Sequence, residues 1–189
     1  MNKKELSNLL SIYKLKTVER RNKVGIRQES SAEHSWSAII LSRFFLPKGI
    51  DGDIVMKLIL YHDLVEIEAG DVCFWDFENR EKIEKLEWKA YDKLKKSLPG
   101  NLGKEFGKYW EEFQEKKTKE AKFAFACDKL DGLLTRVFNG DKFPDFKITK
   151  EDLIKHSNIQ FGDFPEMIKI ALEQIEIAES TGKINDILS

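Results

Sequence analysis

Apolar residues recur at helical spacing along nearly the whole chain, and the alternating spacing of strands is absent. The most apolar segment is 54–65, where apolar side chains face all directions. This pattern predicts a central, buried helix that begins near Asp51 and ends at Gly70. No repeat or low-complexity linker interrupts the chain, and 189 residues suit one sizeable core better than two. We therefore expect an all-α, single-domain helical bundle.

Helix signals divide the rest of the chain. Ser30 and Glu33 have the spacing of a capping box, which predicts a helix that begins there. Its buried face is expected to carry the large apolar residues Trp36, Ile39, Ile40 and Phe44. The basic segment 16–28 contains Gly25 and predicts a loop, and another loop is expected at 74–76. Further helices are expected at 3–15, 78–98, 102–114, 118–139, 150–156 and 164–181.

The charges of the chain nearly cancel, since 32 basic and 33 acidic residues leave a formal net charge of −1. This balance gives no electrostatic reason to expect a nucleic-acid polymer or an anionic membrane as partner, although a single nucleotide needs only a local basic pocket. Cys73 and Cys127 lie far apart, which indicates small thiols in a reducing compartment. The first residues do not resemble a signal peptide, and no run approaches the roughly 20 apolar residues of a membrane span. We expect a cytoplasmic protein.

His62 and Asp63 are neighbours in the most apolar segment. An ionised carboxylate inside a buried helix is costly unless a cation or hydrogen-bond donors compensate it. Taken alone, the pair favours a packed histidine beside a hydrogen-bonded aspartate, with no ligand. Residues elsewhere in the chain change this interpretation.

Three further residues favour a metal site. His34 lies just beyond the cap of the preceding helix, and Asp128 interrupts an apolar run in which a carboxylate is again expensive to bury. Glu66 follows His62 by four residues and Asp63 by three, so one continuous helix would place it beside both. An ion between packed helices could collect two imidazoles and two carboxylates, a donor set that suits one divalent ion such as Mn, Co, Fe, Ni, Zn or Mg. Open positions for water and substrate would be typical of a catalytic site.

His34, then His62-Asp63, then Asp128 follow one another along the chain. In the order and spacing of these residues the chain resembles the HD superfamily of metal-dependent phosphohydrolases, and most closely its 5′-deoxynucleotidase branch. The resemblance covers about residues 5–138, and the tail after about 140 adds little to it. It implies an HD-domain helical bundle over 1–189, with C-terminal helices at 148–185 packing on the core. The motifs that carry it are Glu29-Ser30-Ser31-Ala32-Glu33-His34, Tyr61-His62-Asp63-Leu64-Val65-Glu66, Ala69-Gly70-Asp71, and Glu120-Ala121-Lys122-Phe123 followed by Asp128-Lys129-Leu130-Asp131.

The resemblance also implies roles for individual residues. The metal would be held by His34, His62, Asp63 and Asp128. Glu66 would orient or deprotonate the attacking water, and Asp71 would border the substrate. Alternatively, Glu66 could be an ordinary solvated carboxylate, and Asp71 a turn residue that bonds its own backbone.

The phosphate of a substrate needs a cation, and the segment 16–28 supplies Arg20, Arg21 and Arg27. The resemblance implies an arginine here that positions the phosphate; Arg20 matches it best, with Arg21 next to it. A planar guanidinium suits this role because it binds phosphate oxygens in pairs. A solvated basic loop is the alternative for each of the three.

The chain departs from its family beside that arginine, where members carry a tryptophan that packs near the sugar. Residues 22–24 are Asn-Lys-Val, and the first tryptophan is Trp36, so selection of deoxyribose over ribose is left open. The expected activity is hydrolysis of (deoxy)nucleoside 5′-monophosphates to nucleoside and phosphate. The alternatives are an HD hydrolase of nucleoside triphosphates or cyclic nucleotides, and a catalytically silent metal-binding module.

Two smaller expectations concern the surface of the molecule. The helix expected at 78–98 carries more apolar residues than one domain covers easily, which favours a homodimer. His156 has no motif around it and is expected to be structural or exposed.

Overall fold

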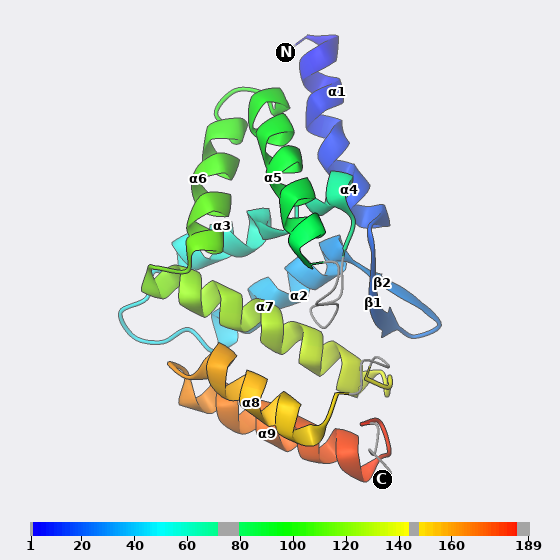
Figure 1. Cartoon of the computed structure of the whole chain (residues 1–189). Coiled ribbons are helices and arrows are strands. Elements are labelled where there is room, and N and C mark those ends of the chain that lie inside the picture. Colours follow the sequence, from blue (N-terminus) through cyan, green and yellow to red (C-terminus); the bar gives the residue numbers. More distant parts are fainter. Residues whose placement is uncertain (1, 72–79, 144–147, 185–189) are drawn as a thin grey trace.

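The computed structural model of the chain describes residues 2–71, 80–143 and 148–184. Figure 1 shows helix α7 crossing the middle of the molecule, with α5 and α6 on one side of it, α8 and α9 on the other, and α2 and α3 behind. This arrangement confirms the expected all-α bundle. The loop expected at 74–76 lies outside the described residues. In chain order the elements are α1 (Lys3–Ser11), the 3₁₀ helix η1 (Ile12–Thr17), β1 (Glu19–Val24), β2 (Arg27–Ser30), α2 (Ser31–Phe44), α3 (Gly52–His62), α4 (Glu66–Ala69), α5 (Arg80–Ser97), α6 (Leu102–Glu115), α7 (Lys119–Phe138), α8 (Lys150–Phe161) and α9 (Pro165–Ser180).

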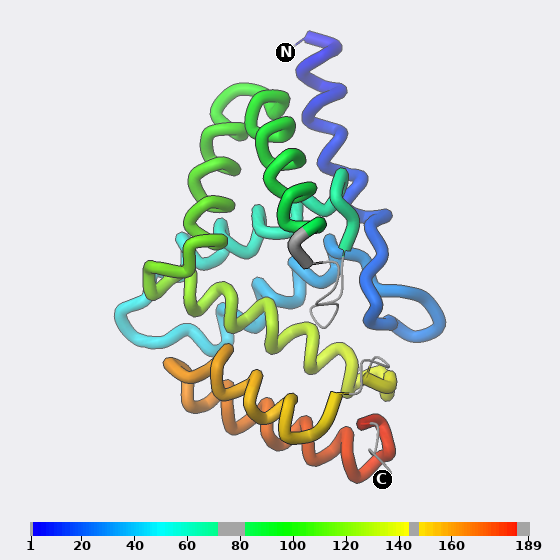
Figure 2. The backbone as a smooth tube through the Cα atoms, viewed as in Figure 1, coloured from blue at the N-terminus to red at the C-terminus, as the bar shows by residue number. Residues whose placement is uncertain are grey.

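Helix α7 is the centre of the packing. It begins where the sequence predicts, because the Thr118 side chain accepts a hydrogen bond from the backbone of Ala121. It contacts α2, α3, α6, α8 and α9, and the backbone trace in Figure 2 shows the C-terminal helix pair lying along it. Phe123 and Leu130 are fully buried on α7. Asp128 is 5% exposed, so this helix carries a carboxylate into the interior.

Helix α2 begins at the predicted capping box, with Ser30 and Glu33 each accepting a hydrogen bond from the backbone of the other. The expected buried face is wrong, however: Trp36, Ile40 and Phe44 are 67%, 53% and 79% exposed, and Ile39 is partly buried. The buried side chains are instead the small or polar ones, Ser31, His34, Ser35, Ala38 and Ser42. Such side chains let α2 approach α7 and α3 closely, and they place His34 inside the bundle.

The chain does not form one helix from 54 to Gly70, as the sequence suggests, because α3 ends at His62. After it the backbone hydrogen bonds span three residues instead of four, from Leu64 N to Tyr61 O and from Glu66 N to Asp63 O. The carbonyl of His62 instead accepts a hydrogen bond of 3.1 Å from the Trp110 indole. The break gives Asp63 a non-helical backbone and places Glu66 at the start of α4.

The segment expected to be a loop contains a small antiparallel hairpin of β1 and β2. Its turn holds Gly25 at φ +63°, a left-handed conformation that glycine adopts without strain. All of its strand side chains except Val24 are polar, so they lack the alternation of apolar and polar residues that marks a half-buried strand. Asn22 is buried in β1; it is 6% exposed and donates a hydrogen bond of 2.9 Å to the carbonyl of Gly132 on α7.

The remaining helices follow the predicted pattern with small differences at their ends. Helix α1 stops at Ser11 and continues as η1, while α8 extends five residues beyond the expected end at 156, to Phe161. None of the helices in the described ranges is long and apolar enough to cross a membrane. Cys127 is a buried free thiol, and Cys73 falls outside the described residues.

Candidate metal centre and substrate pocket

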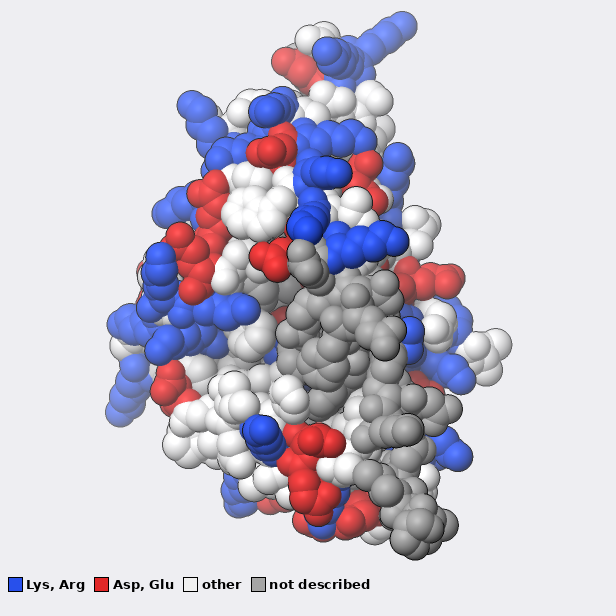
Figure 3. Space-filling model, viewed as in Figure 1, with Lys and Arg blue, Asp and Glu red and all other residues white. Residues whose placement is uncertain are grey.

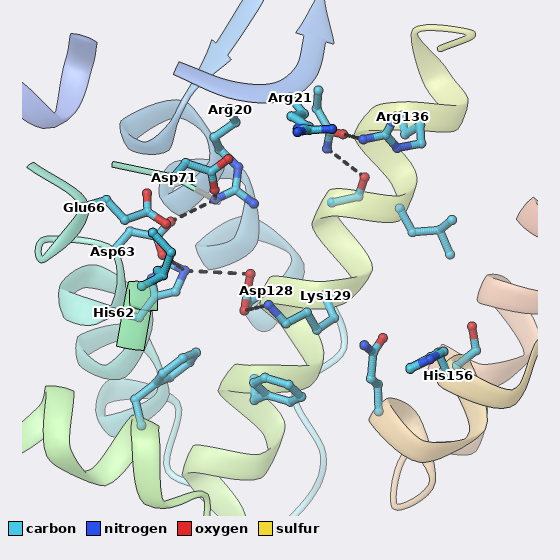
Figure 4. A pocket seen from close by; sticks show the side chains of 18 of the residues that line it. Arg20, Arg21, His62, Asp63, Glu66, Asp71, Asp128, Lys129, Arg136 and His156 are labelled. Atoms are coloured by element: carbon cyan, nitrogen blue, oxygen red, sulfur yellow. Dashed lines mark hydrogen bonds and ion pairs between the residues drawn. The ribbon is translucent and has the colours of Figure 1, made fainter. Parts of the chain in front are cut away.

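Four of the residues expected to bind metal come together inside the bundle, from α2, the end of α3 and α7. Nε2 of His34 lies 3.0 Å from an oxygen of Asp128 and 3.8 Å from one of Asp63. Nε2 of His62 lies 3.0 Å from Asp63 and 3.8 Å from Asp128. All four are at most 8% exposed. Figure 4 shows His62 and Asp63 facing Asp128 across the same space.

The ring nitrogens on the far side of both histidines have their own partners. Nδ1 of His62 donates to the carbonyl of Ile59 at 2.7 Å, and Nδ1 of His34 lies 2.7 Å from Asp131 Oδ2. With Nδ1 carrying the proton, the neutral rings present the lone pair of Nε2 to the carboxylates. Nε2 of His62 is buried without a hydrogen-bond partner. A lone pair facing carboxylate oxygens is repelled unless a proton or a metal ion lies between them, and a divalent metal ion fits this donor set.

The ionisation of the cluster shows the same demand for a cation. Burial lowers the pKa of His62, but the charges of Asp63 and Asp128 outweigh it and raise the pKa to about 10. Burial raises the pKa of Asp63, but His62 and Arg20 lower it to about 2. The pKa of Asp128 is well below its usual value, because Lys129 and both histidines outweigh burial. Protons therefore neutralise a negative field that a metal ion would also neutralise.

Arg20 is held beside the cluster by three carboxylates. Its Nη1 lies 3.2 Å from Asp63 and 3.4 Å from Asp71, and its Nε lies 3.5 Å from Glu29. Burial works to lower the pKa of Arg20, and the charges of Asp63 and Asp71 raise it, so the guanidinium stays charged. The positive group required for a phosphate is thus fixed within reach of the candidate ligands. Figure 4 shows Arg20 and Asp71 on the Glu66 side of the pocket.

Glu66 lies near the cluster despite the break before α4. It is 9% exposed, and one carboxyl oxygen accepts a hydrogen bond of 2.6 Å from Ser31 Oγ on α2. Burial first, and then the charges of Asp63 and Asp71, raise the pKa of Glu66 well above its usual value. A carboxyl group with a raised pKa, hydrogen-bonded on one side, is suited to exchange a proton with a water beside it.

A cavity of about 550 Å³ opens from the cluster, within the usual size range of small-molecule sites. Arg20, Arg21, Glu66 and Asp71 line it, as do three of the four candidate ligands, His62, Asp63 and Asp128. Arg27 is not among its lining residues: the Arg27 side chain is 58% exposed and pairs with Glu33.

The pocket also contains residues that the sequence analysis did not assign to it. Lys129 and Arg136 line it from α7, and His156, Ser157 and Gln160 line it from α8. His156, expected to be structural or exposed, is partly buried in the pocket wall. Its only sequence signal is the four-residue spacing to Gln160, which becomes informative once α8 is known to pack against α7.

Charged side chains of both signs are interspersed over the face of the molecule shown in Figure 3, and no single-sign field dominates it. The local concentration of charge is inside, where acidic residues and Arg20 surround the candidate metal centre.

The fold agrees with that of similar proteins. A family model described as HD domain matches residues 12–168, so the chain belongs to the HD domain family. Its curated relatives include human 5'-deoxynucleotidase HDDC2, which is 26% identical over 157 residues, covering 82% of this chain and 74% of the human protein. The protein of the same name from Dictyostelium discoideum is 29% identical and covers 68% of this chain and 76% of its own length. The alignment with bovine HDDC2 covers 57% of this chain and only 53% of the bovine protein.

Solved structures give the same picture. A protein described as a predicted metal-dependent phosphohydrolase from Magnetospirillum magnetotacticum is 26% identical, with a TM-score of 0.80 and 95% of both chains covered. An HD-domain phosphohydrolase from Listeria innocua, 19% identical with a TM-score of 0.65, shares the fold.

Proposed function

We propose that the protein is a metal-dependent phosphohydrolase that acts on (deoxy)nucleoside 5′-monophosphates and releases inorganic phosphate. The observation that carries this proposal is the meeting of two buried imidazole nitrogens and two buried carboxylates beside a fixed arginine and a buried glutamate. Similarity to the 5'-deoxynucleotidases and to a metal-dependent phosphohydrolase supports it.

The divalent ion would be held by His34, His62, Asp63 and Asp128. When bound, it supplies a Lewis acid for a phosphoryl oxygen and lowers the pKa of a coordinated water. The hydrogen bonds to Ile59 and Asp131 fix both rings with Nε2 toward the site, so the protein provides the donors already oriented. The phosphate-release assay below compares Mn, Co, Fe, Ni, Zn and Mg as the ion.

The other residues of the centre bind and transfer protons. Arg20 would bind the substrate phosphate through its planar guanidinium, with Asp71 and Glu29 keeping it in place. Arg21, which lines the same pocket, is the second candidate. Glu66 would take the proton from the attacking water with one carboxyl oxygen, while the hydrogen bond from Ser31 orients the other.

Nucleoside triphosphates are the second candidate substrate class. The pocket is lined by Arg21, Lys116, Lys129 and Arg136 in addition to Arg20, so further cations are present for the longer phosphate chain of a triphosphate. Lys129 pairs with Asp128, and Arg136 donates to the carbonyl of Lys142, so these charges are partly engaged. The assay below compares both classes directly.

A phosphate-release assay tests the proposal. Metal-stripped protein is resupplied separately with Mn, Co, Fe, Ni, Zn or Mg and offered matched deoxyribo- and ribonucleoside mono- and triphosphates. Release from monophosphates supports the proposal, preference for triphosphates favours the second candidate, and no release with any ion contradicts both. Glu66→Gln should retain metal and lose activity by about 10²–10⁴-fold. The matched control is Glu68→Gln on the same short helix, since Glu68 is exposed and pairs with Lys93.

A homodimer and a cytoplasmic location stay predictions. The described part of α5 buries Ala90, Tyr91 and Leu94, so this helix offers less apolar surface than the sequence suggested. The exposed stripe of Trp36, Ile40 and Phe44 on α2 is the better candidate for contact with a second copy. Light scattering at micromolar concentration should give a dimer mass that Phe44→Ser reduces. A monomeric wild-type protein would contradict the dimer.

A further inference from the structure

The pocket has two ends of different chemistry. One end holds the charged groups of the candidate metal centre. At the other end, α8 contributes Leu153, His156, Ser157, Gln160 and Phe161, and none of these is a Lys, Arg, Asp or Glu. Figure 4 shows His156 across the pocket from Asp128 and Lys129, on a separate helix. A phosphate would find its partners at the first end, whereas an uncharged polar ring would suit the second.

The size of the cavity requires an occupant larger than a phosphate group. About 550 Å³ is the volume of a site for a whole small molecule, and α8 adds no charged group that would fit phosphate to its lining. The substrate therefore has an organic body that extends away from the cluster along α7. Helix α7 connects the two ends, because Asp128, Lys129, Leu133 and Arg136 all line the same cavity.

We propose that the α8 end of the pocket binds the nucleobase of the substrate, with His156 and Gln160 as the residues that determine base specificity. This inference rests on the proposed function. His156 and Gln160 are four residues apart on one face of α8, and both are partly buried. Imidazole and amide groups can each donate and accept, as the edge of a base requires. Phe143, Leu153 and Phe161 supply an apolar surface around them.

The alternative, a second phosphate site at this end, has less support. The cation nearest in sequence to the α8 wall that also lines the pocket is Arg136 on α7. Its guanidinium donates to the carbonyl of Lys142 and to the side chain of Asn22, and it lies 5.4 Å from the centre of the Phe143 ring. Helices α8 and α9 add no Lys or Arg to the described lining. An uncharged base is the chemistry that these groups fit.

Two conservative variants test the proposal independently. His156→Phe keeps a ring but removes both nitrogens, and Gln160→Met keeps the length but removes the amide. Lys155→Met is the matched control, since Lys155 is exposed on the same helix and does not line the pocket. Each test variant should raise KM for nucleoside 5′-monophosphates roughly three- to tenfold and change the ranking of the four bases. Hydrolysis of 2-deoxyribose 5-phosphate, which lacks a base, should be unchanged, and so should kcat.

Calorimetric binding of the same nucleotides to metal-free protein separates the two proposals. Wild-type protein that binds nucleotides but releases no phosphate, with binding weakened in both variants, would overturn the activity and support the base site. Unchanged KM, binding and base ranking in both variants would overturn the base site and leave the activity standing. An equal loss on the base-free substrate would also overturn it, because the residues would then act on the phosphate end.

Discussion

Nδ1 of His34 lies 2.7 Å from Oδ2 of Asp131, and both side chains are almost completely buried. The two residues are on α2 and α7, the helix pair that also brings His34 to Asp128. A carboxylate on Nδ1 fixes the ring orientation and directs the lone pair of Nε2 toward the cluster. Glu29 is 2% exposed, and one of its carboxyl oxygens lies within 4.8 Å of a ring nitrogen of His34 and of a carboxyl oxygen of Asp131. We therefore propose that Asp131 is a positioning residue for the candidate metal centre.

Asp131→Asn should weaken metal binding by about 10–100-fold, because the neutral amide no longer stabilises the Nδ1–H form of His34. Competition with a chromophoric chelator measures the affinity without an activity assay. Asp163→Asn serves as the control, since Asp163 is exposed and pairs with Lys122. Equal affinity in wild type and Asp131→Asn would show that the carboxylate does not position the ring.

The sequence predicts which residues form the centre, but not the backbone geometry that brings them together. His34, His62, Asp63 and Asp128 stand out because polar groups in apolar segments need compensation, and packing of α2, α3 and α7 does bring them together. The break after His62 could not be predicted, because the group that its carbonyl bonds there, the Trp110 indole, is 48 residues away in the chain. Glu66 reaches the site through that break and the hydrogen bond from Ser31, and the continuous helix assumed from the spacing does not exist.

Helical periodicity identifies an apolar stripe but not what it faces. Trp36 and Phe44 lie on such a stripe and are exposed, because α2 turns its serines and His34 toward α7. The hairpin could not be predicted for a related reason: its strands are stabilised by pairing with each other and by the hydrogen bond from Asn22 to the carbonyl of Gly132 on α7, and neither contact leaves an alternating pattern in the sequence. The role of α8 in the pocket depends on tertiary packing alone.

Gly70 connects Glu66 and Asp71 and has φ +78° and ψ 159°, a conformation that is almost restricted to glycine. Gly70→Ala should lower the free energy of unfolding by about 1–3 kcal/mol and reduce kcat, since relief of the strain would displace Asp71 from Arg20. A Cβ at this position would meet no atom within 4 Å, so the expected loss of stability comes from backbone strain and not from a steric clash. Urea denaturation and phosphate release measure the two effects. Gly182→Ala, also at positive φ in open space, should affect stability but leave activity unchanged.

The capping box of α2 should make stability depend on pH in the acidic range. Hydrogen bonds from Arg27 and from the Ser30 backbone lower the pKa of Glu33 from 4.5 to about 2. A depressed folded-state pKa means that this stabilisation is complete above pH 4.5 and is lost as the pH falls toward 2. Glu33→Gln should therefore cost about 0.5–1 kcal/mol at pH 7, since the pair is solvent-exposed, and the difference should shrink below pH 4.5. Urea titrations of both proteins at pH 7, 5 and 4 test this; a constant difference would contradict it.

Metal binding should raise the stability of the whole bundle, because the cluster joins three helices of the core. Without the ion, the charges of Asp63 and Asp128 are balanced by the histidines, Arg20 and Lys129, and an ion that binds only the folded protein adds its binding free energy to the stability. A divalent ion at 100 times its dissociation constant should add about 2.7 kcal/mol and raise Tm by roughly 5–10 °C. Calorimetry with and without chelator measures the shift. Asp128→Asn should remove most of it, whereas Asp163→Asn should keep it. An equal shift in Asp128→Asn would place the ion elsewhere.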